Sequence, residues 1–87
     1  MSENTNLKIA LDNAADLLSN NNLNESIEQL EEILAVHPLN LDALSLQLDI
    51  NIKQNKVENA LELIKKLIQL DPNNRLYQEK LIKVYQF

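Results

Sequence analysis

The stretch KQNKVENALELIKKLIQLDPNN, residues 53–74, decides the fold of this chain. Its apolar residues recur at intervals of three and four, a spacing that places them along one face of a helix. The members of this face are Val57, Ala60, Leu61, Ile64, Leu67 and Ile68. The face stops before Asp71 and Pro72, and a proline just beyond the last apolar residue is typical of a helix end. The stretch therefore predicts one amphipathic helix with a turn on each side.

A closely similar pattern stands earlier in the chain, in SNNNLNESIEQLEEILAVHPLN, residues 19–40. The two stretches match at one constant offset, which pairs Asn21 with Asn55, Ile27 with Leu61, Leu30 with Ile64, Leu34 with Ile68, Pro38 with Pro72, and Asn40 with Asn74. Asn22, followed by Glu25 three positions later, predicts a side-chain cap at the start of the earlier helix. A period of about 34 residues, with two helices in each unit, predicts an array of helical hairpins.

The segments on either side of these stretches also predict helices. One apolar face is formed by Leu7, Ala10, Leu11, Ala14, Leu17 and Leu18. A last helix, from about residue 74 onward, carries Leu76, Tyr77, Leu81, Tyr85 and Phe87. Residues 1–6 are polar, and we expect them to form a disordered N-terminus.

Residues 44–52 alternate between apolar and polar side chains, as a strand does. On a helix, at about 100° per residue, Leu44 and Leu48 share one side. Leu46 and Ile50 then lie nearly opposite, which is expected of a helix packed between neighbours. We predict a helix, because the other segments are helical and a lone strand would leave its backbone N–H and C=O groups without partners.

Composition narrows the class of protein. The 87 residues suffice for one domain, and the absence of glycine argues against an all-β fold with many tight turns. Without cysteine the chain has no disulfide and no thiolate metal site. No signal peptide and no apolar run long enough for a bilayer is evident, so we expect a cytoplasmic protein without membrane insertion.

Charge is distributed unevenly along the chain. The net charge of −5 disfavours nucleic acid as a partner. Residues 1–40 carry a net charge of −6, whereas residues 41–87 carry +1. Ordinary surface variation is the simplest interpretation, but the asymmetry could also orient a partner or favour head-to-tail contact between copies.

The stretch 53–74 closely resembles the second helix and closing turn of a tetratricopeptide repeat (TPR). Ala60 stands at the small helix-packing position of that family, Ile64 at its aromatic position and Pro72 at its terminal proline. The corresponding residues of the earlier unit are Ser26, Leu30 and Pro38. Asn21 and Asn55 stand where the family usually has glycine between its two helices, in a turn that requires a left-handed residue.

The resemblance extends over residues 7–87 and implies an all-α fold, a short right-handed solenoid of helical hairpins with about five helices. Its parts are repeat 1 at residues 7–40, repeat 2 at residues 41–74 and a C-terminal capping helix at residues 75–87, within one domain. The first helix of each unit departs from the family pattern. Leu48 replaces a small residue where the helices approach closely, so wider spacing is expected there.

TPR proteins generally bind peptides in a groove lined by the first helix of each repeat. By resemblance, the groove positions of this chain are Leu11, Ala15, Leu18, Ser45, Asp49, Ile52, Glu79 and Lys83, with Asp42 at the edge. The bases that clamp a carboxylate in chaperone-binding members are replaced, except at Lys83. The resemblance therefore implies an apolar groove with acidic flanks, which suits an amphipathic helix or an extended apolar segment with basic residues. The implied function is that of a scaffold or adaptor for another protein.

Two alternatives remain open. The chain could be a self-associating structural subunit, with a homodimer face at Leu11, Leu18 and Ile52 or at the aromatic C-terminal helix with Tyr77, Tyr85 and Phe87. Covering the open end of the repeats is the simpler interpretation of those aromatic side chains. The chain could also be an interaction domain of a larger protein.

No catalytic constellation is evident in the sequence. The single histidine, His37, precedes Pro38 at a predicted helix end and has no nucleophile to pair with, and no glycine-rich phosphate loop occurs. Glu25, Glu28, Glu31 and Glu32 share one helix, where a solvated face is favoured over a metal site. We therefore expect neither an enzyme nor a metal or cofactor.

Overall fold

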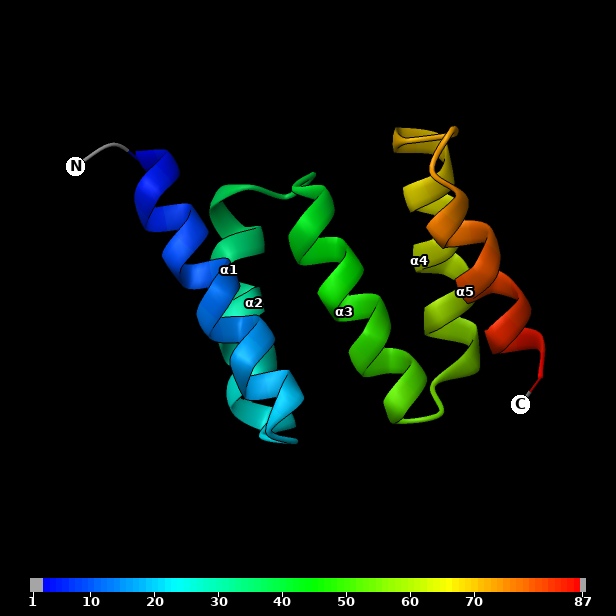
Figure 1. Ribbon diagram of the computed structural model, residues 1–87, viewed down its shortest axis with the longest axis horizontal. Helices are drawn as coiled ribbons and strands as arrows, with labels where there is room; N and C mark the ends of the chain where they lie inside the picture. The colour runs from blue at the N-terminus through cyan, green and yellow to red at the C-terminus, as the bar shows by residue number, and fades with distance from the viewer. Residues whose placement is uncertain (1–2, 87) are drawn as a thin grey trace. The chain divides into compact units, whose positions relative to one another are not determined.

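A computed structural model describes residues 3–86, and within them it contains five α-helices and no strand. The helices are α1 (Glu3–Ser19), α2 (Leu23–Val36), α3 (Leu41–Lys53), α4 (Val57–Leu70) and α5 (Arg75–Tyr85) (Figure 1). The all-α prediction is confirmed, including the helix in the alternating segment 44–52. α1 begins earlier than expected, so residues 3–6, which the sequence assigns to a disordered N-terminus, form its first turn.

The chain divides into two compact units, Met1–Gln47 and Leu48–Phe87. The division lies inside α3 rather than after Asn40, where the repeat pattern places a boundary. The first unit contains α1, α2 and the start of α3, and the second contains the end of α3, α4 and α5.

The turns after α1 and α3 have the same backbone geometry at matching positions of the repeat. Asn21 has φ 63° and Asn55 has φ 58°, so both adopt the left-handed conformation expected at these positions. The N–H of Asn22 donates to the carbonyl of Leu17 (2.8 Å), and the N–H of Asn21 donates to Leu18 (3.0 Å). The second turn repeats both bonds with Lys56 to Asn51 (2.9 Å) and Asn55 to Ile52 (3.1 Å). This pair of bonds around a left-handed residue is the Schellman arrangement, which satisfies the last carbonyls of a helix.

Asparagine side chains cap both α3 and α5, through the N–H three residues later in α3 and two residues later in α5. The Oδ1 of Asn40 accepts from the N–H of Ala43, and the Oδ1 of Asn74 accepts from the N–H of Leu76, both at 2.9 Å. Each bond satisfies an N–H that the first turn of a helix leaves unpaired. The predicted side-chain cap at Asn22 is wrong: the residue precedes α2, but its side chain makes no capping hydrogen bond. Its backbone φ of −87° and ψ of 67° lie outside the extended region that a capping side chain normally requires.

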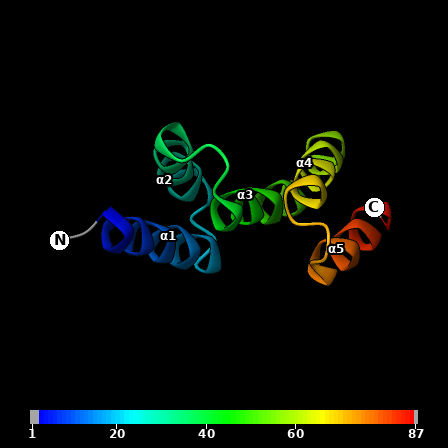
Figure 2. The same ribbon diagram turned by 90° about the horizontal axis from the view of Figure 1, so that it is seen from above.

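Small residues bring α1 and α2 together as an antiparallel hairpin (Figures 1 and 2). Ala14 and Ser26 are both fully buried, and the hydroxyl of Ser26 donates to the carbonyl oxygen of Ala14 at 2.9 Å. The bond gives the buried hydroxyl a partner, which removes the penalty of an unsatisfied polar group. The core of this hairpin also contains Leu18, Leu30 and Ile33.

The second unit is built around α4, which packs closely on α5. Its buried residues are Leu48, Ile50, Ala60, Ile64, Leu67, Tyr77 and Val84. Leu48 and Ile50 lie about 200° apart around a helix, and both are buried. Two-sided burial explains the strand-like alternation of this segment, because a helix buried on two sides needs apolar residues on both.

Replacing Asn55 by alanine tests the left-handed turn. Alanine carries a Cβ that disfavours positive φ and lacks the local hydrogen bonding of asparagine, so we expect Asn55→Ala to lower the free energy of unfolding by about 1 kcal/mol. Asn55→Gly should leave it unchanged or raise it slightly, because glycine adopts this conformation without a steric penalty. Urea unfolding followed by circular dichroism measures both. Equal stability of the two variants would contradict the turn geometry.

Candidate interaction groove

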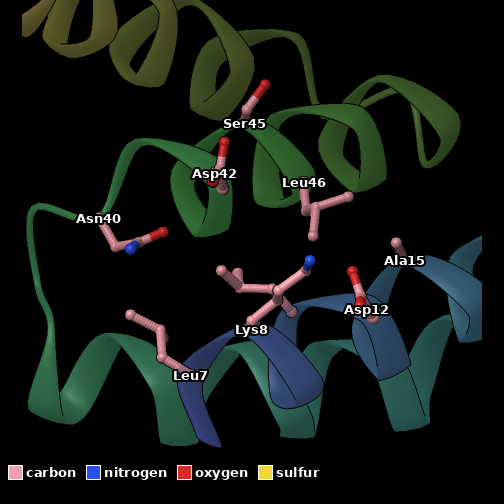
Figure 3. A pocket seen from close by; sticks show the side chains of 9 residues that line it. Leu7, Lys8, Asp12, Ala15, Asn40, Asp42, Ser45 and Leu46 are labelled. Carbon is pink, nitrogen blue, oxygen red and sulfur yellow. The ribbon is translucent and has the colours of Figure 1, made fainter. Parts of the chain in front are cut away.

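An open groove of about 610 Å³ lies in the first unit, between α1 and the start of α3. Figure 3 shows its two walls, with Leu7, Lys8, Asp12 and Ala15 on one side and Asn40, Asp42, Ser45 and Leu46 on the other. Leu11 completes the lining. The Lys8 ammonium group reaches up between the walls (Figure 3).

The wall on α1 follows from helical spacing. Leu7, Leu11 and Ala15 recur at every fourth position, and all three are half-buried. They stand beside the fully buried Ala14, which faces α2, so α1 presents a second, narrower apolar strip. The other wall begins where Asn40 caps α3, and Leu46 supplies its apolar part.

The rim of the groove is more negative than positive. Asp12 and Asp42 are exposed carboxylates, and Lys8 is the one basic residue in the lining. The apolar floor, with two carboxylates and one ammonium group, provides contact area and a preference for a cationic ligand.

The structure brings together four of the nine residues predicted to bind a partner. Leu11, Ala15, Asp42 and Ser45 all line the groove. Leu18 does not, because its side chain is 7% exposed and belongs to the core of the α1–α2 hairpin. A residue buried to this degree offers no contact surface, which also removes it from the proposed homodimer face.

The remaining predicted residues belong to the second unit and do not line this groove. Asp49 is engaged within the unit: its Oδ1 accepts a charge-assisted hydrogen bond from the Nζ of Lys80 on α5. Ile52 is half-buried, whereas Glu79 and Lys83 are exposed on α5.

The two tyrosines of the C-terminal segment differ in burial. Tyr77 is 3% exposed and packs into the second unit, whereas Tyr85 is 69% exposed. The burial of Tyr77 agrees with the capping interpretation rather than with a free dimer face. Phe87 lies outside the described residues.

Sequence reasoning missed five lining residues, namely Leu7, Lys8, Asp12, Asn40 and Leu46. Leu7 lies one helical turn before Leu11, and Lys8 and Asp12 are its neighbours along the same side, so helical spacing from Leu11 could have found all three. The alternating pattern predicts a packed face for Leu46, and only the fold shows this residue beside the groove. Lys80 was also missed as the partner of Asp49, because residues 31 apart give no local signal.

The sequence repeat relates the groove to the Asp49–Lys80 pair. Asp49 is the counterpart of Ala15, and Lys80 is the counterpart of Leu46. Where the first unit has two apolar side chains that border an open groove, the second has an ion pair that joins α3 to α5. The same helix–helix position is thus open in one unit and bridged in the other.

No group of three or more histidine, aspartate or glutamate side chains within residues 5–86 is arranged to hold a metal ion, and this includes the glutamates of α2. None of the helices in this range combines the length and the hydrophobicity that crossing a membrane requires. Comparison of the chain with protein-family models, curated proteins and solved structures finds no significant match.

The Asp49–Lys80 pair should contribute modestly to stability. The Lys80 side chain is 16% exposed and that of Asp49 is 37% exposed, so the pair is partly shielded from water. We expect a double-mutant cycle with Asp49→Asn and Lys80→Met to give a coupling energy of about 0.5–1 kcal/mol at low salt, and less at high salt. Glu79→Gln is the matched control, because Glu79 is exposed on the same helix. A coupling energy of zero at low salt would show that the pair does not persist in solution.

Proposed function

We propose that this chain is a TPR-type protein-interaction module, a scaffold or adaptor that holds a segment of a partner protein in the groove of its first unit. The proposal includes the right-handed solenoid that the resemblance implies. Support comes from the repeat itself: the left-handed asparagines, the Schellman bonds and the asparagine caps each recur at matching positions, one repeat period apart.

The groove in the first unit is the observation that supports the proposal most directly. A hollow of about 610 Å³ with leucine and alanine on its floor is large enough for several side chains of a bound segment. Binding is assigned to the first unit because the counterpart position in the second is bridged by Asp49 and Lys80. The proposed activity is binding alone.

The chemistry of the lining selects the kind of ligand. Leu7, Leu11 and Leu46 favour apolar side chains, and the carboxylates of Asp12 and Asp42 favour a nearby lysine or arginine. An amphipathic helix with apolar residues one turn apart and a basic flank meets both requirements. An extended apolar segment with a basic residue is the other form of ligand that fits.

A synthetic peptide of alternating leucine and lysine blocks, designed as an amphipathic helix and labelled with a fluorophore, probes this groove. We expect it to bind more tightly than its leucine–glutamate counterpart in fluorescence anisotropy. Leu11→Glu should weaken binding at least about tenfold, because a charge replaces an apolar contact of about 1.5–3 kcal/mol. Ile9→Glu is the matched control: Ile9 is 50% exposed on the same helix but does not line the groove.

A second variant closes the groove without adding a lone charge. Ala15→Asp together with Leu46→Lys copies the Asp49–Lys80 pair into the first unit and should abolish peptide binding while helical circular dichroism is retained. Undiminished binding by this double variant or by Leu11→Glu would overturn the assignment of the groove.

A further inference from the structure

A second, smaller hollow of about 250 Å³ lies in the first unit, between α1 and the end of α2. Its apolar lining consists of Leu7, Ala10, Ile33 and Val36. Pockets that enclose a small molecule usually have volumes of about 300–1,000 Å³, so a space of this size suits a single side chain instead. We refer to it as the Ala10 hollow.

The small side chain of Ala10 accounts for the open space. Ala10 is half-buried, and the repeat places Leu44 at the equivalent position one period later. Leu44 is 3% exposed, so a leucine is accommodated at this position of the repeat. Val36, at the rim, is likewise smaller than its counterpart Leu70. An apolar side chain that enters the hollow is removed from water, which favours its binding.

The Ala10 hollow adjoins the peptide groove. Leu7 lines both spaces, and its side chain is half-buried (Figure 3). At about 100° per residue, Ala10 lies about 60° to one side of Leu7 around α1, and Leu11 lies about 40° to the other side. Leu7 therefore forms a ridge between the groove and the hollow, and one bound segment that crosses this ridge contacts both.

The distance across the ridge fits an extended chain. Ala10 and Leu11 are about 100° apart on a helix about 10 Å in diameter, so the outer surfaces at these two positions are about 8 Å apart. In an extended chain, alternate side chains point to the same side and are about 7 Å apart. Residues two positions apart on a helix point to different sides, so a helix cannot present such a pair. The geometry therefore selects two apolar residues separated by one.

The charges around the hollow favour a basic residue in the ligand. Lys8, the one basic residue of the groove lining, lies nearly opposite Ala10 around α1, about 160° away. The hollow is bordered instead by the exposed carboxylate of Glu32 and by His37. Residues 1–47 contain eight acidic residues and one basic residue, a net charge of −7. A lysine or arginine is therefore expected next to the ligand residue that enters the hollow.

We propose that the partner segment held by the groove is extended, with two apolar residues separated by one and an adjacent lysine or arginine. One apolar side chain lies in the groove beside Leu11, and the other enters the Ala10 hollow. The inference rests on the proposed function, because the hollow is a second position for the same ligand. It selects the extended segment as the natural ligand, since an amphipathic helix would occupy the groove alone.

Amide chemical-shift titrations with short synthetic peptides measure the dissociation constants that test the proposal. On the natural chain, Lys-Leu-Ser-Leu-Lys should bind at least about fivefold more tightly than Lys-Leu-Ser-Ser-Lys, because its second leucine is removed from water. It should also bind more tightly than Lys-Leu-Ser-Ser-Ser-Leu-Lys, in which the two leucines have helical spacing.

Two variants change the hollow and leave the groove lining intact. Ala10→Leu fills the hollow with the residue that Leu44 supplies at the equivalent position, and it should remove the advantage of the second leucine without weakening the one-leucine peptide. Val36→Ser reduces the apolar lining at a side chain that is 66% exposed, so it should fold normally and lower the same advantage. Leu70→Ser, its repeat counterpart in the second unit, is the matched control and should have no effect.

The outcomes separate this inference from the proposed groove. An equal affinity of the natural chain for the one-leucine and two-leucine peptides would overturn the inference, as would an undiminished advantage in both Ala10→Leu and Val36→Ser. Tighter binding of the helically spaced peptide would also overturn it. In each of these cases the groove assignment stands if Leu11→Glu weakens the one-leucine peptide. Absence of binding by every peptide would overturn the groove and the inference together.

Discussion

The contact between Ala14 and Ser26 is the constraint on which the rest of the first unit depends. Both residues are fully buried, and the hydrogen bond from the Ser26 hydroxyl to the Ala14 carbonyl is possible only because neither side chain holds the helices apart. This face of α1 packs against α2. The neighbouring residues Leu11 and Ala15 therefore remain accessible and form a wall of the groove. One close approach thus determines both the hairpin and the surface beside it.

Much of the fold could be predicted from the sequence, because local rules govern it. Apolar spacing predicts the helices, and a repeated asparagine predicts the left-handed turns, which a positive φ at Asn21 and Asn55 confirms. The features that could not be predicted depend on tertiary contacts. Leu18 is apolar whether it lines a groove or a core, so its sequence position cannot distinguish the two. The Asp49–Lys80 pair joins residues 31 apart in the chain, and only the fold brings them together.

The two units differ at one matched helix–helix position, and the proposed function depends on this difference. Ala15 and Leu46 leave their helix–helix position open, and substitution of the equivalent positions by Asp49 and Lys80 bridges it. A partly shielded ion pair adds little to stability, so its larger consequence under this proposal is to exclude a ligand from the second unit.

Amide chemical shifts recorded during titration with the leucine–lysine peptide test the proposed groove most directly. The account predicts that the largest changes fall on residues 7–15 and 40–46, with little change at Asp49, Lys80 and the neighbouring residues of the second unit. Changes concentrated at Asp49 and Lys80, or spread evenly over the exposed residues of both units, would contradict it.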